Sequence, residues 1–361
     1  MTRVRDAIVV GGGPVGLAFA VAAAGRGLDV LVLEPRPHPV DKACGEGILP
    51  AGVRALATLG VLDRLPAVDA SPVEALRWVD AGASLEVRLP APGGLGVRRT
   101  ALSAALAARA REAGAELREV AALDHRRGRD AVTVETTAGA FRGRLLVAAD
   151  GLASPVRCRE GLDRPVGGTR RFGLRRHLAW GGLGAAVEVH LGDGVEAYLT
   201  PAGTGRTGVA FLFDGVKPGG WEGLLARFPS LAGRLEGAAT LSEDRGAGPL
   251  VRRARARVLD RLVLLGDAGG SLDPLSGEGL TLGLGGALDL AALAPEAIAA
   301  GATRAALIGY ERAWARRWRR AALATSALLA LAHRPGLRRT VMAAAARAPG
   351  PLERLVALAS C

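Results

Sequence analysis

The sequence predicts an α/β fold in which a parallel-sheet domain is interrupted by a β-rich domain and followed by helices. Three observations support this prediction. Short apolar strands alternate with helical stretches near both ends of the 361-residue chain. Alternating residues between Phe172 and Phe213 are typical of half-buried strands. Beyond Ala302 the hydrophobic period is helical throughout.

The predicted elements follow in order along the chain. Asp6 to Gly11 is expected as a buried strand, Pro14 to Arg26 as a helix and Asp29 to Leu33 as a second strand. The next elements expected around the same sheet are a helix at Thr100 to Ala113, strands at Glu116 to Val120, Ala131 to Thr136, Arg144 to Ala149 and Arg261 to Leu265, and a long helix from Gly277. In the β-rich segment Val187, Val189 and Leu191 share one face of a strand, with Glu188 and His190 on the other.

These elements predict three regions. We expect a discontinuous parallel-sheet domain at residues 1–72, 99–164 and 259–300, an inserted β-rich domain at 73–98 and 165–258, and a helical C-terminal region at 301–361.

Composition is that of a folded globular protein, because 49% of the residues are hydrophobic and 23% are charged. No run reaches 18 uninterrupted apolar residues, so we expect no membrane-spanning helix. Three cysteines, Cys44, Cys158 and Cys361, are too few for a disulfide framework, and no convincing leader cleavage region follows the first apolar stretch. We therefore expect a cytoplasmic protein.

The chain is strongly basic, with a net charge of +12, and Lys42 and Lys217 are its only lysines among 47 basic residues. Aromatic residues make up 4% and the arginines are mostly scattered, so the stacking surfaces of nucleic-acid binders are missing and we expect no nucleic-acid partner. Arginines concentrate in the C-terminal third, where they form either a peripheral membrane contact or a solvated helical face. They are Arg312, Arg316, Arg317, Arg319, Arg320, Arg338 and Arg339.

A dinucleotide fingerprint, Gly11-x-Gly13-x-x-Gly16, lies between the first strand and the first helix, which begins at Pro14. Gly11 permits a tight turn, Gly13 lets the backbone approach a pyrophosphate, and Gly16 allows close packing of the helix on the strand. Glu34 ends the second strand, 23 residues after Gly11, in position to accept hydrogen bonds from a ribose. The sequence therefore predicts a Rossmann-type nucleotide-binding domain.

Two later segments extend this pattern. Asp150-Gly151-Leu152-Ala153-Ser154-Pro155-Val156-Arg157 resembles a DG motif, and Gly266-Asp267-Ala268-Gly269-Gly270-Ser271-Leu272-Asp273-Pro274 followed by Leu275-Ser276-Gly277-Glu278-Gly279 resembles a GD motif. With the fingerprint, they make the chain similar to the FAD-dependent monooxygenases of the aromatic-hydroxylase superfamily and to the related geranylgeranyl reductases.

The resemblance implies a bound FAD, with Asp267 on its ribityl chain, and NAD(P)H as a transient electron donor. Arg99 resembles the family arginine that reaches FAD from a helix start, although the adjacent Arg98 is an alternative contact. Asp41 to Gly47 resembles the loop beside the flavin in the reductase-like branch. The residues assigned to the cofactor are Gly11, Gly13, Pro14, Gly16, Glu34, Arg36, Lys42, Cys44, Gly45, Arg99, Val120, Asp150, Gly151, Gly266, Asp267, Pro274, Gly277, Glu278 and Gly279.

The sequence also departs from the family pattern. Gly269-Gly270 and Leu280-Thr281 stand where many aromatic hydroxylases carry a histidine and an asparagine, which favours the reductase-like branch. Flavin-dependent halogenases share parts of the framework, but their Trp-x-Trp-x-Ile-Pro signature is absent and no lysine lies between Lys42 and Lys217.

No catalytic carboxylate pair, nucleophile triad or zinc signature stands out, as expected when the flavin itself is the reactive group. Cys44, Tyr198 and Pro274 are candidate pocket residues. His177 and His190 have no ligand-spaced partner, and a structural role is the more common one for such residues.

Three functional hypotheses follow. The first is an FAD-dependent, NAD(P)H-consuming monooxygenase that transfers one atom of molecular oxygen to a hydrophobic small molecule through a flavin C4a-hydroperoxide, in specialised metabolism. The second is a flavin-dependent reductase of prenyl or quinone double bonds. The third is a flavin-bearing protein of the membrane surface whose arginine-rich helices bind acidic lipids.

Overall fold

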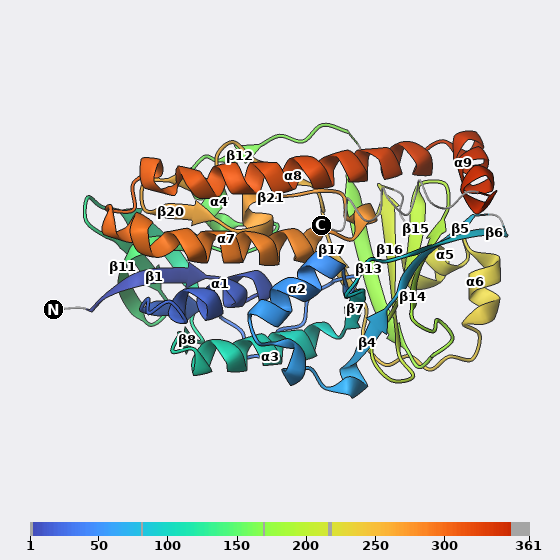
Figure 1. The fold of residues 1–361 in the computed structure, drawn as a ribbon, viewed down its shortest axis with the longest axis horizontal. Helices are drawn as coiled ribbons and strands as arrows, with labels where there is room; N and C mark the ends of the chain where they lie inside the picture. The colour runs from blue at the N-terminus through green and yellow to red at the C-terminus, as the bar shows by residue number, and fades with distance from the viewer. Residues whose placement is uncertain (1–2, 81, 169, 216–218, 348–361) are drawn as a thin grey trace.

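The computed structural model describes residues 3–347 except 81, 169 and 216–218 (Figure 1). Lys217, Cys361 and the predicted C-terminal segment at 348–361 lie outside the described residues. Two main sheets are arranged at opposite ends of the molecule, and the helices α7 and α8 run alongside them (Figure 1).

The first sheet has eight strands, and it confirms the predicted parallel-sheet domain. Its order is β19-β20-β11-β1-β2-β8, with β10 on β11 and β9 on β10. The pairings of β1 with β11 and β2, of β2 with β8, and of β11 with β20 are parallel. The strands are β1 (Val4–Val10), β2 (Val30–Leu33), β8 (Glu116–Arg118), β9 (Ala122–Arg127), β10 (Val132–Thr136), β11 (Gly139–Ala148), β19 (Val258–Leu259) and β20 (Leu262–Leu264).

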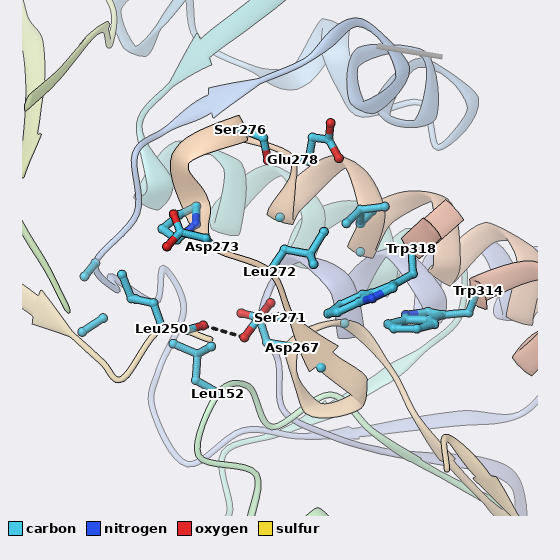
Figure 2. A pocket seen from close by; sticks show the side chains of 18 residues that line it. Leu152, Leu250, Asp267, Ser271, Leu272, Asp273, Ser276, Glu278, Trp314 and Trp318 are labelled. Atoms are coloured by element: carbon cyan, nitrogen blue, oxygen red, sulfur yellow. Dashed lines mark hydrogen bonds between the residues drawn. The ribbon is translucent and has the colours of Figure 1, made fainter. Parts of the chain in front are cut away.

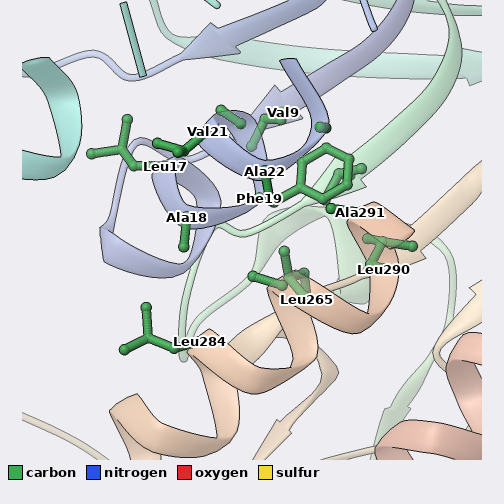
Figure 3. Close-up of a cluster of buried hydrophobic side chains, with 14 of the residues drawn as sticks. Val9, Leu17, Ala18, Phe19, Val21, Ala22, Leu265, Leu284, Leu290 and Ala291 are labelled. Carbon is green, nitrogen blue, oxygen red and sulfur yellow. The ribbon is translucent and has the colours of Figure 1, made fainter. Parts of the chain in front are cut away.

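Both faces of this sheet are buried, as a parallel sheet requires. Val9 faces a core shared with the helices α1 (Pro14–Ala24), α3 (Arg99–Glu112) and α7 (Gly279–Ala299), whereas Ile8 faces a second core. Figure 3 shows the contact between α1 and α7, where Phe19 and Leu290 meet. The helix α7 is long and apolar enough to cross a membrane, but 56% of its most apolar window is buried, so we assign it to the core.

The second sheet has seven strands in the order β17-β13-β16-β15-β14-β5-β6. Strand β5 pairs in parallel with β14, although 105 residues lie between these two strands in the sequence.

 Those 105 residues are the ones between the end of β5 at Asp80 and the start of β14 at Ala186. The strands are β5 (Ala75–Asp80), β6 (Ala83–Arg88), β13 (Arg171–Leu178), β14 (Ala186–Leu191), β15 (Val195–Pro201), β16 (Thr207–Asp214) and β17 (Arg245–Ala247).

Two small three-stranded sheets connect the two main ones. One has the order β3-β7-β4, and the other has the order β12-β18-β21. The strands are β3 (Gly47–Ile48), β4 (Ala70–Val73), β7 (Gly94–Val97), β12 (Asp163–Arg164), β18 (Arg252–Ala254) and β21 (Gly270–Ser271). The remaining short helices are α2 (Pro50–Thr58), α4 (Pro155–Arg159), α5 (Gly220–Leu225), α6 (Pro229–Arg234) and the 3₁₀ turns η1 (Leu62–Arg64), η2 (Ala67–Asp69), η3 (Gly266–Gly269) and η4 (Pro274–Ser276).

The C-terminal region is helical in its described part, as predicted. Helix α8 (Arg304–Ala332) packs along α7, and α9 (Pro335–Arg347) packs on β6 at the far sheet (Figure 1). Arg338 of α9 makes a buried ion pair with Asp80 at the end of β5, with 2.7 Å between Nε and Oδ2. The three-region boundaries at 1–72, 99–164 and 259–300, at 73–98 and 165–258, and at 301–361 stay a prediction.

The polar face predicted for the strand at Ala186–Leu191 is not open to solvent. Glu188 and His190 are both buried, because α6 and the neighbouring strand cover that face. Burial would raise the pKa of Glu188, but its hydrogen bond with His190 and its ion pairs with Arg234 and Arg77 lower that pKa to about 2. The alternation in the sequence therefore marks two buried faces of different polarity.

Candidate functional site

The turn from β1 into α1 has the geometry that the fingerprint predicts. Gly11 has a φ of +106°, and a Cβ there would lie 2.4 Å from the carbonyl oxygen of Ala149. A Cβ on Gly16 would lie 2.1 Å from the carbonyl oxygen of Gly11. The nearest atom to a Cβ on Gly13 is 3.9 Å away, in the guanidinium of Arg99. Gly11 and Gly16 are therefore required by the fold, whereas Gly13 leaves open space beside a basic side chain.

This open space lies at a helix N-terminus. Pro14 occupies the first turn of α1, where its missing N–H costs no hydrogen bond, and no side chain caps the helix. The free N–H groups of such a terminus attract an anion, and a phosphate is the usual one after this kind of turn. The geometry therefore fits a pyrophosphate between α1 and Arg99.

Glu34 lies at the end of β2, directly beside this turn. Its side chain is buried and accepts hydrogen bonds from the Gly12 N–H at 3.0 Å and from Arg36 Nε at 2.7 Å. Burial alone would raise its pKa, but the bond from Arg36 and that from Gly12 hold the pKa below its ordinary value. Glu34 is thus an ionised acceptor, the form in which a carboxylate binds ribose hydroxyls.

Lys42 links the two ends of the site electrostatically. Its side chain is largely buried, and burial together with Arg36 and Arg99 lowers its pKa, while the carboxylates of Glu34 and Asp267 raise it. One ammonium group therefore lies within the fields of two carboxylates that are 233 positions apart in the sequence. The sequence-predicted contacts at Glu34 and Asp267 converge on the same region.

The segment after β11 contributes a second acidic group. Asp150 accepts the Val156 N–H at 3.1 Å through one carboxylate oxygen, while its other oxygen, Oδ1, is buried without a hydrogen-bond partner among the described residues. Burial raises the pKa of Asp150. A Cβ on Gly151 would lie 3.6 Å from Lys42 Nζ, so this turn faces the basic side chain. An unsatisfied buried oxygen of this kind needs a donor from a bound molecule.

Arg157 joins this segment to the later GD motif. It is almost fully buried, and its guanidinium donates to the carbonyl oxygens of Leu152 at 2.7 Å and Ala268 at 3.0 Å. The side chain of Asp267 has no hydrogen-bond donor among the described residues, and burial raises its pKa. The positive charges of Arg99, Lys42 and Arg157 oppose this rise in its pKa. The carboxylate of Asp267 is thus free for a ligand hydroxyl.

The end of the GD motif makes a turn into α7. Asp273 accepts the Leu275 N–H at 3.0 Å and pairs with Arg171 of β13 at 3.2 Å, which fixes the motif to the second sheet. Gly277 adopts a φ of +69°, and α7 starts at Gly279. Glu278 is 4% exposed, its carboxyl group has no hydrogen-bond partner among the described residues, and burial alone raises its pKa to about 7.

A cavity of about 160 Å³ lies against these residues (Figure 2). Its lining is mainly apolar, with Asp267, Asp273 and Glu278 as the acidic groups. The lining residues are Ala43, Leu152, Ala247, Leu250, Gly266, Asp267, Gly270, Ser271, Leu272, Asp273, Pro274, Ser276, Glu278, Gly279, Leu282, Gly283, Trp314 and Trp318. In this part of the chain the cavity joins the GD motif, the loop at Ala43 and helix α8.

The loop at residues 41–47 is held by strand β13 through buried polar groups. Arg175 donates to Asp41 at 2.7 Å and to His177 Nδ1 at 2.9 Å, and His177 Nε2 lies 2.6 Å from Glu46. Because a guanidinium only donates, Nδ1 of His177 carries no proton, so Nε2 donates to Glu46. The other carboxylate oxygen of Glu46 accepts the Arg99 N–H at 2.8 Å. Sequence reasoning missed Arg175, His177 and Glu46 as site residues, since nothing local pairs them.

Arg99, Cys44 and Tyr198, which the sequence also predicts as site residues, lie at different distances from the cofactor site and the cavity. Arg99 begins α3 beside Gly13, whereas Arg98 precedes the helix, so Arg99 is the better candidate for the cofactor. Cys44 is half-buried and accepts the Glu46 N–H at 3.4 Å, and Gly45 next to it is exposed. Tyr198 donates to the carbonyl oxygen of Leu275 at 2.8 Å and does not line the cavity.

Val120 follows β8 and packs against the second core, which places its side chain on the sheet. Within the described ranges, no three His, Cys, Asp or Glu side chains cluster closely enough to hold a metal ion.

Residues in this arrangement fit FAD. A dinucleotide with one ribose, a pyrophosphate and one ribityl chain needs hydrogen-bond acceptors at both ends and room for the phosphates. The site offers these in the open space at Gly13, the ionised Glu34, the unsatisfied oxygen of Asp150 and the free carboxylate of Asp267. Glu34 and Gly13 would hold the ribose and pyrophosphate, and Asp267 the ribityl chain.

Comparison with known proteins decides the family. Residues 5–176 match the model described as an FAD binding domain. Ubiquinone hydroxylase UbiL of Rhodospirillum rubrum is 31% identical over 319 residues, which cover 82% of this chain and 73% of the relative. The chain belongs to the FAD-dependent monooxygenase superfamily.

Members and neighbours of the superfamily carry different activities. A menaquinone reductase of Mycobacterium tuberculosis is 29% identical over 306 residues, which cover 77% of this flavoenzyme and 74% of the relative. The solved structure of the flavin-dependent brominase Bmp2 superposes with a TM-score of 0.83 over 99% of this chain and 94% of its own, at 16% identity, and this likeness shows a shared fold. The protein is an FAD-dependent oxidoreductase of this superfamily.

Proposed function

We propose that this flavoenzyme is a monooxygenase that consumes NAD(P)H and inserts one atom of molecular oxygen into a hydrophobic small molecule of specialised metabolism. The balance is that substrate, O₂, NAD(P)H and one proton give hydroxylated substrate, water and NAD(P)⁺. The observation that carries the proposal is the mainly apolar cavity joined to the Asp267 end of the site. The relative named as a ubiquinone hydroxylase supports the same reaction class.

Bound FAD supplies the two-electron redox chemistry and the activation of oxygen. The chain's own residues bind and orient it and exclude water. Leu152, Leu250 and Leu272 supply apolar walls, so a substrate at Pro274 would lie in a site with little water. The C4a-hydroperoxide route that the resemblance implies stays a prediction.

The N-terminus of α7 adds an electrostatic contribution. Backbone N–H groups at Gly279 point out of the helix at the cavity and favour negative charge there. Burial raises the pKa of Glu278 to about 7, so this side chain is partly protonated at neutral pH and opposes that charge less than a fully ionised carboxylate would. The chain thereby stabilises the negatively charged form of a ligand bound at this end of the site.

A second candidate is a reductase of prenyl or quinone double bonds. In that reaction a C=C bond, NAD(P)H and one proton give the saturated product and NAD(P)⁺. The buried Glu278 in the cavity favours it, because an acid whose pKa is raised to about 7 is suited to deliver the proton near neutral pH. The relative named as a menaquinone reductase supports the same class.

Two measurements on the FAD-loaded enzyme separate the candidates. The first follows NAD(P)H oxidation and peroxide release with phenolic, quinone and prenyl compounds, and then uses isotopically labelled O₂ with the best compound. Label in the product supports the monooxygenase. Sustained substrate reduction under anaerobic conditions, with no label in the aerobic product, overturns it in favour of the reductase.

We further propose a cytoplasmic location. Localisation of the full-length protein by fractionation tests this, and recovery outside the cytoplasmic and membrane-surface fractions would contradict it.

A further inference from the structure

The outward face of helix α8 has an unusual composition. Arg312, Arg316, Arg319, Arg320 and Leu323 are exposed and recur at the three- and four-residue spacing that places them on one side of the helix. Figure 1 shows α8 on the outer side of α7, from the first sheet to the second. We call these five residues the α8 face, and the exposed Leu337 lies on the next helix, α9.

The arginines of this face are not used by the fold. Of the C-terminal arginines, Arg317 pairs with Asp289 and Arg338 pairs with Asp80. Among the described residues, no ion pair or hydrogen bond engages the guanidinium groups of Arg312, Arg316, Arg319 or Arg320. Four positive charges on one helix face, none of them paired with a carboxylate of the described chain, attract a negatively charged surface.

The face becomes apolar after the arginines. Leu323 is 74% exposed, which is the largest value among the exposed large hydrophobic residues of the described chain, and Leu337 is 45% exposed. Ala327 and Ala330 are exposed on the same side between them. Arginines followed by an exposed leucine along one helix, with a second exposed leucine on the helix that follows, match the requirements of a bilayer interface, where headgroups bind the charges and acyl chains surround the leucines.

We infer that the α8 face binds the surface of an anionic lipid bilayer. Charge complementarity favours this partner, because both the unpaired arginines and the exposed leucines are used by it. A nucleic acid would leave the leucines in water, and a second copy of this basic chain would bring like charges together. The inner side of the same helix carries Trp314 and Trp318 into the cavity, so the bound bilayer would lie against the helix that also lines the site. The inference holds for either proposed reaction.

Vesicle flotation of the full-length, FAD-loaded protein tests the inference. The probes are phosphatidylcholine vesicles with and without phosphatidylglycerol. We expect binding to the anionic vesicles only, and loss of this binding at high salt. The variant R316Q/R319Q/R320Q should bind about a hundredfold more weakly. Leu323→Gln should weaken binding about tenfold.

Matched controls remove the same groups elsewhere. R129Q/R142Q/R170Q deletes three exposed arginines, and Leu123→Gln deletes an exposed leucine. Both should bind like the unchanged protein, and FAD content and thermal unfolding show that each variant is folded.

Three results would overturn the inference. The first is that the unchanged protein does not float with anionic vesicles. The second is that the control variants lose vesicle binding as much as the α8-face variants do. The third is that Leu323→Gln leaves vesicle binding unaffected but changes the protein from dimer to monomer in sedimentation. The last result would assign the face to a second copy of the chain.

Discussion

The buried link between Glu46 and His177 gives a sharp test of how the site is held. We predict that Glu46→Gln lowers the free energy of unfolding of the FAD-free protein by about 2 to 4 kcal/mol. Glu46 is 2% exposed and accepts two hydrogen bonds, from His177 at 2.6 Å and from the Arg99 N–H at 2.8 Å. A glutamine offers one carbonyl oxygen for these two donors and turns an NH₂ group toward the other, so one buried donor loses its partner.

The assay is urea unfolding of single variants and a double-mutant cycle. His177→Gln removes the other partner, and the two substitutions together should be non-additive by about 1 kcal/mol or more, because they break the same bond. Glu86→Gln is the control, since the ion pair of Glu86 with Arg77 is exposed, and it should change the unfolding free energy by less than about 1 kcal/mol.

The reasoning fails under two outcomes. A Glu46→Gln protein within about 0.5 kcal/mol of the unchanged one would show that these bonds do not stabilise the loop. Full additivity with His177→Gln would show that the two side chains do not interact.

Three further predictions concern the site. Gly13→Ala should fold normally, because a Cβ there meets nothing closer than 3.9 Å, but it should lose FAD binding because the methyl group enters the space left for the pyrophosphate. Gly16→Ala should be destabilised, because its Cβ would lie 2.1 Å from the carbonyl oxygen of Gly11. Thermal unfolding and FAD titration distinguish the two variants. Glu278 ionises near 4.5 when unfolded and at about 7 when folded, so this group alone should lower the free energy of unfolding by about 3 kcal/mol as the pH rises between these values. Glu278→Gln should remove this contribution, and a pH dependence of the unfolding free energy that the substitution leaves unchanged would contradict the prediction. Tyr198→Phe should cost about 1 kcal/mol by leaving the Leu275 carbonyl unsatisfied, measured by urea unfolding, with no change expected if the bond is absent.

Much of the nucleotide end of the site could be predicted from the sequence because its determinants are local. Gly11, Gly13 and Gly16 lie within one turn, and Glu34 follows at the end of the next strand. A tight turn, a helix start and the length of a βαβ unit fix their relative positions.

The link through His177 could not be predicted in this way. Glu46 and His177 are 131 positions apart, and they meet only because two sheets and an insertion bring β13 to the loop at 41–47. The lack of a partner for the Glu278 carboxyl group could not be predicted for the same reason, because it depends on which distant parts of the chain surround this side chain. The burial of the polar face of β14, which carries Glu188 and His190, could not be predicted either. Alternation of polar and apolar residues shows that a strand has two different faces, but it does not show whether the polar face is exposed to solvent.

A crystal structure of the protein grown with FAD tests the central claim most directly. The account predicts one FAD per chain, with a ribose hydroxyl on the Glu34 carboxylate, the pyrophosphate at Gly13, and the ribityl chain on Asp267. Density for FAD that reaches only one of the two carboxylates, or that lies away from both, would contradict it.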